Sequence, residues 1–299
     1  MMFKNVIGHE NVIQRLESSI AGNKISHAYI FAGRRGVGKK TVANAFADIL
    51  TGGSFADIIT VTNEYYGIDS KSDIVSVDTI RAASADMYMK PYLADRRIFI
   101  IPDAEKMNVQ AQNALLKIFE EPPSYCVIIL ITQNDNMLLQ TIRSRAITVR
   151  FGLLSDSQVR DYARSKGIEV SDIAIRLAFG SIGMVQELSE NEELDGMLGD
   201  FAGLFAKIGS GTAECIYALI DYLQKEKKNS EVLFDIMLIM LRDTMLGKKS
   251  ELAIKGLNSR KAVRIIELVE NTRNSFSFNA DYNMAVSEML LNILGETNG

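Results

Sequence analysis

The stretch GRRGVGKKT, residues Gly33–Thr41, comes close to the pattern of a loop that holds nucleotide phosphates. That pattern is Gly, any four residues, Gly, Lys and then Ser or Thr. Gly33, Gly38 and Lys39 fit it, whereas Lys40 stands where the hydroxyl should be. The glycines allow a tight turn whose backbone N–H groups face a phosphate at a helix N-terminus, although they would also serve a turn without a ligand. The candidate nucleotide-binding residues are Gly33, Gly36, Val37, Gly38, Lys39, Lys40 and Thr41.

The two positions that would hold Mg²⁺ in such a site are damaged. Lys40 carries donors only and cannot ligate a cation, and Thr41 faces roughly 100° away around the helix. A second metal ligand would follow the third expected strand, where the sequence has Pro102 and then Asp103. Proline offers no side-chain oxygen, and we interpret Asp103 and Glu105 as parts of a solvated turn. We therefore expect no metal here and little or no hydrolysis of a bound nucleotide.

Arg145 ends the stretch LLQTIRSR, just before an expected strand. The simplest reason for its place is that the helix dipole favours a cation at the C-terminal end of a helix. The functional interpretation is an arginine finger, a side chain that reaches the phosphate site of a neighbouring subunit. Arg143 is a second candidate, but we expect it to be solvated on a helix face.

A basic group lies in and around the same loop. Arg34, Arg35, Lys39 and Lys40 supply more positive charge than one phosphate site needs. They fit phosphate binding, contact with DNA or a solvated surface, and the sequence leaves the three interpretations open.

Short apolar runs alternate with amphipathic stretches through the first half of the chain. Such runs indicate strands of a parallel sheet that helices cover on both faces. Their alternation with helices indicates right-handed crossovers and a doubly wound α/β fold. The expected strands are 28–33, 57–61, 96–101, 126–132 and 146–151, and the expected helices between them are 40–50, 77–89, 108–121 and 136–145.

After Phe151 the strand pattern stops and helical patterns follow to the end of the chain. The stretch 181–200 ends in an acidic, glycine-containing segment that we interpret as a linker. We expect a nucleotide-binding-like domain over residues 1–152, a small helical domain over 153–198 and an all-helical domain over 199–299.

Composition limits the classes of function. A net charge of −4 over 299 residues argues against a broad basic face, so that any contact with nucleic acid is local or shared with partners. Cys126 and Cys215 are far apart, and His9 and His27 lack nearby metal-ligand neighbours, which indicates a reducing compartment and no metal cluster. The most apolar run, 232–241, is too short to cross a bilayer. No signal segment is evident, and we expect a cytoplasmic protein without membrane contact.

Three stretches together resemble the bacterial clamp-loader AAA+ subunits of DNA polymerase III. They are HAYIFAGRRGVGKKTVA, VDTIRAASADMYMKPYLADRRIFIIPDAEKMNVQAQNALLKIFEEPP and LLQTIRSR. The resemblance is strong over residues 6–151, continues weakly through IRLAFGSIGMVQEL and returns in FNADYNMAVSEMLLNIL. It implies an AAA+ domain, a helical lid domain and a helical collar domain that joins subunits into a ring, with the boundaries given above.

Within that family the sequence is more similar to the delta-prime type of subunit than to the gamma/tau type. The gamma/tau type has complete ATPase motifs and usually a four-cysteine zinc module, whereas delta-prime has eroded motifs and an arginine finger in a Ser-Arg-Cys motif. Lys40 and Pro102 match the eroded pattern. Ala146 replaces the cysteine but Arg145 is kept, and no cysteine module follows the first helix, so we expect no zinc. Met184 stands where an ATPase would place a sensing arginine.

The resemblance therefore implies a stator of the clamp loader. Arg145 would act in trans on ATP bound to an adjacent gamma/tau subunit. The implied partners are gamma/tau, delta and, through the complex, the sliding clamp and primer–template DNA. No cofactor is required, and ATP or ADP would be bound, if at all, without efficient hydrolysis. Two alternatives remain: a genuine ATP-hydrolysing gamma/tau-type subunit in which Asp103 replaces the lost acid, and an AAA+ adaptor or helicase loader.

Overall fold

The computed structural model describes residues 3, 6–69, 74–247, 252–276 and 280–298. Residues 278–279, which begin the stretch compared with a collar helix, lie outside the described part. The chain divides into two compact units. The first consists of Met1–Tyr162 with Gly180–Gly183, and the second of Ala163–Phe179 with Met184–Gly299. All the candidate site residues lie in the first unit.

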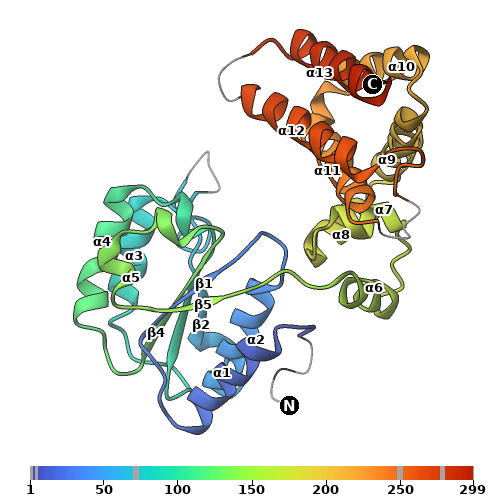
Figure 1. Cartoon of the computed structure of the whole chain (residues 1–299). Coiled ribbons are helices and arrows are strands. Elements are labelled where there is room, and N and C mark those ends of the chain that lie inside the picture. Colours follow the sequence, from blue (N-terminus) through green and yellow to red (C-terminus); the bar gives the residue numbers. More distant parts are fainter. Residues whose placement is uncertain (1–2, 4–5, 70–73, 248–251, 277–279, 299) are drawn as a thin grey trace. The chain divides into compact units, whose positions relative to one another are not determined.

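Five parallel strands form the sheet of the first unit (Figure 1). Their order across the sheet is β2-β3-β4-β1-β5, so that β1 lies between β4 and β5. Strands β1, β3 and β4 are buried along their whole length, which explains why their sequences are continuous apolar runs. The strands are β1 (Ala28–Ala32), β2 (Ile58–Thr60), β3 (Arg97–Ile101), β4 (Cys126–Thr132) and β5 (Ile147–Arg150).

Helices cover both faces of the sheet, and successive side chains of each strand point to opposite faces (Figure 1). Ile30 of β1 belongs to a core that β1 shares with α3, α4 and α5, whereas its neighbours Tyr29 and Phe31 belong to a second core with α1 and α2. The expected doubly wound α/β fold is thus confirmed. The helices are α1 (Glu10–Ala21), α2 (Lys39–Thr51), α3 (Val77–Asp86), α4 (Val109–Glu120) and α5 (Gln140–Arg143), and the 3-10 turns are η1 (Phe55–Asp57), η2 (Ala104–Lys106) and η3 (Asp135–Met137).

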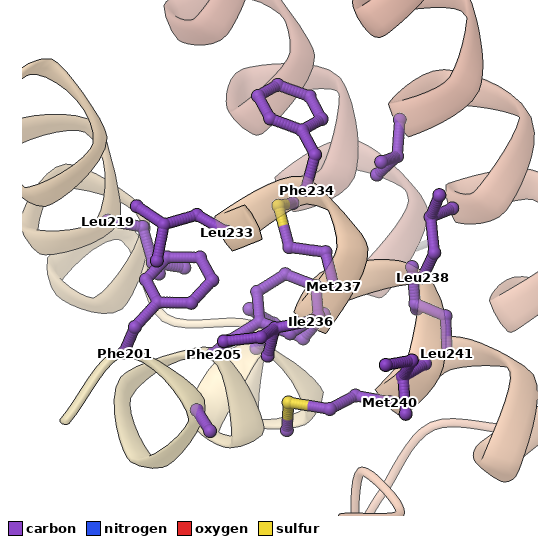
Figure 2. Close-up of a cluster of buried hydrophobic side chains, with 14 of the residues drawn as sticks. Phe201, Phe205, Leu219, Leu233, Phe234, Ile236, Met237, Leu238, Met240 and Leu241 are labelled. Atoms are coloured by element: carbon purple, nitrogen blue, oxygen red, sulfur yellow. The ribbon is translucent and has the colours of Figure 1, made fainter. Parts of the chain in front are cut away.

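The part of the chain after β5 is mostly helical, as expected. The core of the second unit surrounds α11, whose buried Phe234, Met237 and Leu241 belong to the same cluster of apolar side chains as Phe201 and Phe205 of α9 (Figure 2). The elements are α6 (Asp156–Ser165), α7 (Asp172–Leu177), α8 (Ile182–Ser189), α9 (Glu192–Phe205), η4 (Ala206–Ser210), α10 (Ala213–Lys225), η5 (Lys227–Asn229), α11 (Ser230–Met245), α12 (Ser259–Ser275) and α13 (Tyr282–Asn298).

The prediction of a linker before residue 200 is wrong, because helix α9 occupies Glu192–Phe205. Leu198, Phe201, Ala202 and Phe205 are buried at helical spacing, which stabilises the helix despite its glycines. The expected boundary after residue 198 falls within this helix, and the division into three domains stays a prediction.

The long helix expected over 136–145 is also wrong. The segment forms η3 and the four-residue helix α5, and between them Leu138 has an extended backbone and Leu139 is the N-cap of α5. The N–H of Leu139 donates to Oε1 of Gln112 at 2.7 Å, and Leu138 is buried. These tertiary contacts replace helical hydrogen bonds at the break.

Among the residues that the structure describes, no helix is both long and apolar enough to cross a bilayer.

Candidate phosphate-binding loop and exposed arginine

The loop between β1 and α2 lies at the carboxyl end of the sheet, where β1 is flanked by β4 and β5. In open parallel sheets, ligands bind outside the carboxyl ends of the strands. They bind where the connections from two adjacent strands run to opposite faces of the sheet. Gly38 is the N-cap of α2, so the N-terminus of that helix faces the loop. The expected strand–loop–helix context of the candidate site is therefore present.

Glycine is required at the loop for two different reasons. Gly36 and Gly38 have φ angles of +76° and +100°, which L side chains rarely adopt. At Gly33 the limit is space, because a Cβ atom would lie 2.6 Å from the carbonyl oxygen of Phe151. Val37 is buried in the core with α1 and α2 and anchors the middle of the loop.

Lys39 is folded back onto the loop and is only 6% exposed. Its Nζ donates to the carbonyl oxygens of Gly33 at 2.5 Å and Arg34 at 2.7 Å. Burial lowers the pKa of Lys39, and the negative charges of Glu105 and Asp103 partly offset that effect. The ammonium has three N–H donors, and these two carbonyl oxygens take two of them.

Two contacts that the sequence did not predict hold the loop from outside. Nε2 of His9 donates to the carbonyl oxygen of Val37 at 2.7 Å, and the His9 ring packs edge-on against Phe151 at 5.0 Å between centroids. The N–H of Gly183 donates to the carbonyl oxygen of Gly36 at 3.0 Å. A Cβ atom on Gly36 would lie 3.1 Å from Cα of Gly183, so the two backbones meet at glycines.

The other basic residues of the loop are exposed. Lys40 and Thr41 lie in the first turn of α2 with exposed side chains, and Arg34 and Arg35 are also exposed. Lys40 therefore adds positive charge beside the loop, where a hydroxyl would have provided a metal ligand.

The degenerate acidic motif lies directly after β3. Pro102 takes the expected place of a metal-binding carboxylate, and Asp103 is exposed and paired with Lys106 at 2.9 Å. The solvated turn expected here agrees with the placement of Asp103, whereas Glu105, in the same turn, is only partly solvated. One carboxylate oxygen of Glu105 is buried without a hydrogen-bond partner among the described residues, and its charge acts on Lys39. The structure thus brings Glu105, Asp103 and Lys39 into one electrostatic neighbourhood.

Arg145 lies two residues beyond α5, on the side of the sheet opposite α2. Its guanidinium donates to the carbonyl oxygen of Thr141 at 3.1 Å and to Glu120 at 3.2 Å, and its side chain is 38% exposed. The structure therefore separates Arg145 from the group of residues around the loop.

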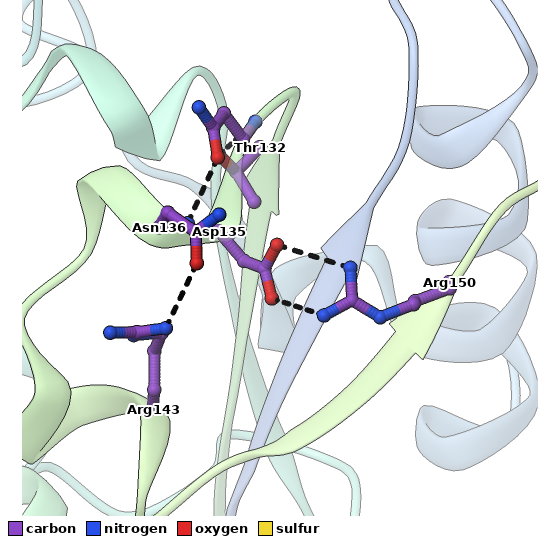
Figure 3. Close-up of polar contacts among 6 residues, drawn as sticks. Thr132, Asp135, Asn136, Arg143 and Arg150 are labelled. Atoms are coloured by element: carbon purple, nitrogen blue, oxygen red, sulfur yellow. Dashed lines mark hydrogen bonds and ion pairs between the residues drawn. The ribbon is translucent and has the colours of Figure 1, made fainter.

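Arg143 differs from its expected solvated role. It donates to Oδ1 of Asn136 at 3.1 Å, and its Nε is buried. Close by, Arg150 at the end of β5 forms a two-pronged ion pair with Asp135, which begins η3 (Figure 3). No pattern in the sequence indicated that pair, because Asp135 follows β4, Arg150 ends β5, and β1 lies between those two strands.

Residues 8–155 match the protein family described as "DNA polymerase III, delta subunit". The chain is similar to DNA polymerase III subunit tau of Bacillus subtilis, with 32% identity over 163 residues, covering 48% of this chain and 28% of that protein. It is also similar to subunit tau/gamma of Haemophilus influenzae, with 29% identity over 180 residues, covering 54% of this chain and 25% of that protein. The chain thus spans about a quarter of the length of these relatives.

Among solved structures, the chain is similar to a gamma subunit-related protein of Thermotoga maritima, at 21% identity with a TM-score of 0.47. That likeness covers 94% of this chain and 99% of the other. From the family match and the sequence relatives, residues 8–155 belong to the delta-subunit-like clamp-loader family of DNA polymerase III, which is related to the gamma and tau subunits.

Proposed function

We propose that this chain is a delta-prime-type subunit of the DNA polymerase III clamp loader, a stator with little or no ATPase activity of its own. One observation carries the proposal: Lys40 and Pro102 occupy both places that would hold Mg²⁺, while Arg145 remains exposed beyond α5. A phosphate loop without metal ligands stabilises little charge in a transition state. An exposed arginine on the other side of the sheet is available to a neighbour.

In this proposal Arg145 acts as an arginine finger. It leaves Glu120 and Thr141 and reaches the phosphates of ATP bound to an adjacent gamma/tau subunit, where it stabilises the charge that develops as the terminal phosphoryl group is transferred. Glu120 keeps the guanidinium at the surface through a pair in which both side chains are partly solvated. Such a pair is weak, so exchanging it for a phosphate costs little.

The proposed partners are gamma/tau and delta subunits in a ring, and through that ring the sliding clamp and primer–template DNA, in the cytoplasm. A nucleotide bound at this chain's own loop would serve as a structural ligand. Its N–H groups and Lys39 would hold the phosphates, and no residue at the two metal positions would hold Mg²⁺.

The alternative is an ATP-hydrolysing gamma/tau-type subunit. Two observations favour keeping it: the similar proteins named above are tau and tau/gamma subunits, and Glu105 places a carboxylate near Lys39. This alternative predicts turnover by the isolated chain that Lys39→Ala abolishes.

The test is a reconstituted complex of the matching gamma/tau and delta subunits. ATP hydrolysis stimulated by DNA and clamp would be measured without this chain, with it, and with its Arg145→Ala variant. Arg81→Ala is the matched control, because Arg81 also forms an exposed ion pair, with Asp78 at 3.2 Å. We expect stimulation by the native chain and the control, and its loss with Arg145→Ala. Hydrolysis indifferent to the chain would refute the proposal.

A further inference from the structure

Arg145 lies in the crossover that connects β4 to β5, residues 133–146. Because β4 and β5 are both parallel to β1, the crossover begins at the carboxyl edge of the sheet and ends at the amino edge. Its regular structure consists of η3, with three residues, and α5, with four. A helix of one turn has no stability of its own. The position of Arg145 therefore depends on the contacts that hold α5.

The carboxamide of Gln112, in α4, bonds to the crossover immediately before α5. Its Nε2 donates to the carbonyl oxygen of Met137 at 3.1 Å, and its Oε1 accepts from the N–H of Leu139 at 2.7 Å. Nε2 also donates to the carbonyl oxygen of Met107, just before α4, at 3.0 Å. Met137 ends η3 and Leu139 is the N-cap of α5. The carboxamide therefore bonds the backbone on both sides of Leu138, as a neighbouring β-strand would.

These bonds differ from the apolar contacts that also hold the crossover. Leu138 and Ile142 are buried in the core that covers this face of the sheet. Apolar contacts are not directional, whereas hydrogen bonds are. Gln112 is 3% exposed, so that water does not readily take the place of a lost bond there. Loss of the carboxamide should therefore leave α5 packed on the sheet but able to shift along it.

A short series of hydrogen bonds joins Arg145 to the start of α5. The carbonyl oxygen of Leu139 accepts from the N–H groups of Ile142 at 3.0 Å and Arg143 at 3.1 Å. The carbonyl oxygen of Ile142 accepts from the N–H of Arg145 at 3.1 Å. The Arg145 guanidinium donates to the carbonyl oxygen of Thr141 at 3.1 Å. A shift of Leu139 would therefore move Arg145 with it.

Helix α4 thus holds the segment 139–145 at two places. Gln112, in the first turn of α4, bonds the start of α5, and Glu120, the last residue of α4, accepts from the Arg145 guanidinium at 3.2 Å. The side chain of Glu120 is 54% exposed, whereas Gln112 is buried. A phosphate on a neighbouring subunit can therefore take the guanidinium from Glu120 at little cost, while Gln112 stays bonded and keeps α5 in place.

We propose that Gln112 is a positioning residue for Arg145, an inference that rests on the proposed role of Arg145 as an arginine finger. Gln112 acts through α5 and not on the nucleotide. It fixes the start of the segment from which the guanidinium reaches its target. Misplacing a catalytic group by about 1 Å is enough to lower a rate roughly 100-fold.

The test uses two variants of Gln112 and a control on the same helix. Gln112→Met keeps the length of the side chain and removes all three hydrogen bonds. Gln112→Glu keeps an acceptor for the N–H of Leu139 and loses both donors. The control is Asn108→Ala, which removes the N-cap bond from the N–H of Ala111 to Oδ1 of Asn108. That change weakens α4 without removing a bond to the crossover.

The first measurement is kcat and KM for ATP in the reconstituted complex. We expect Gln112→Met to lower kcat roughly 10- to 100-fold. KM should stay unchanged, because ATP is bound by the neighbouring subunit and the finger acts in the transition state. Gln112→Glu should give an intermediate kcat, and Asn108→Ala should leave kcat unchanged. The second measurement is amide hydrogen exchange in the isolated chain, which Gln112→Met should speed roughly tenfold at Leu139, Ile142 and Arg143.

Unchanged kcat with both Gln112 variants, in a complex where Arg145→Ala lowers kcat, would overturn the inference and leave the finger intact. An equal loss with Asn108→Ala would also overturn it, because the effect would then come from the stability of α4. Unchanged exchange at Leu139 with Gln112→Met would overturn it as well. If Arg145→Ala itself has no effect, the proposed function fails, and the inference fails with it.

Discussion

The phosphate loop and the crossover from β4 to β5, which carries Arg145, belong to the same sheet, but their positive side chains differ in burial and in what they bind. At the loop, Lys39 is buried and bonded to the backbone of the loop itself, and Val37 and Gly36 are held by His9 and Gly183. At the crossover, Arg145 is partly exposed and bonded through a weak surface pair. A charge that serves its own backbone stabilises local structure, whereas a charge kept at the surface is available to a partner.

The largest loss of stability should come from adding a side chain at Gly33 of the phosphate loop. Gly33→Ala would place Cβ 2.6 Å from the Phe151 carbonyl oxygen, a backbone atom that cannot turn away. We expect a loss of about 3 kcal/mol in the free energy of unfolding of the first unit, measured by urea denaturation. Gly38→Ala is the control, because nothing lies within 4 Å of its Cβ position and only backbone strain of about 1–2 kcal/mol applies. Equal losses would contradict the tight contact with Phe151.

Removing the two cations separately sharpens the comparison. Lys39→Met leaves the carbonyls of Gly33 and Arg34 without a donor and should cost about 2 kcal/mol of unfolding free energy. Arg145→Met breaks only a partly solvated pair and should cost less than about 0.5 kcal/mol. Thermal and urea unfolding of the two variants would measure the difference. A larger loss for Arg145→Met would mean that this arginine is structural.

An effect that depends on pH is expected just before β2, the strand at one side of the sheet, where the buried carboxylate of Asp57 accepts hydrogen bonds from backbone N–H groups. Burial by itself would raise the pKa of Asp57, but N–H groups of Tyr92, Leu93 and Ala94 and the hydroxyl of Ser54 lower it to about 2. Because the pKa of Asp57 in the folded chain is below its ordinary value of 3.8, its ionised carboxylate stabilises the fold at pH values above 3.8. This contribution is lost as the pH falls toward 2.

We therefore expect the stability of the wild-type chain to fall between about pH 4 and pH 2. Asp57→Asn should be less stable at pH 7, and its stability should depend less on pH in that window. The measurement is the thermal midpoint across the pH range. Identical pH slopes for the two chains would show that Asp57 is not the titrating group.

The sheet could be predicted from sequence because its strands are buried on both faces, so that runs such as Cys126–Thr132 are continuously apolar. The phosphate loop could also be predicted, because its glycines stand at positions whose backbone angles or close contacts exclude other residues. The linker was a wrong prediction because the acidic residues and glycines of α9 obscured the apolar stripe from Leu198 to Phe205.

Other features depend on contacts between distant parts of the chain. The break before α5 is set by Gln112 on another helix, and the bond between His9 and Val37 joins segments that no periodicity connects. The ion pair of Asp135 and Arg150 could be predicted only with the strand order, because Asp135 follows β4, Arg150 ends β5, and β1 lies between those strands. The residues of the phosphate loop could therefore be predicted as a sequence motif. The contacts made by His9, Gln112 and Asp135 could not, because their partners are distant in the sequence.

The most direct test of the account compares the two cations within one reconstituted complex. The rate of DNA- and clamp-stimulated ATP hydrolysis would be measured with this chain carrying Lys39→Ala or Arg145→Ala. The account predicts that Arg145→Ala lowers the rate roughly 1,000-fold or more, and that Lys39→Ala leaves it unchanged once complex assembly is verified. Loss of hydrolysis with Lys39→Ala and none with Arg145→Ala would contradict the account, and would show that this chain hydrolyses ATP at its own loop.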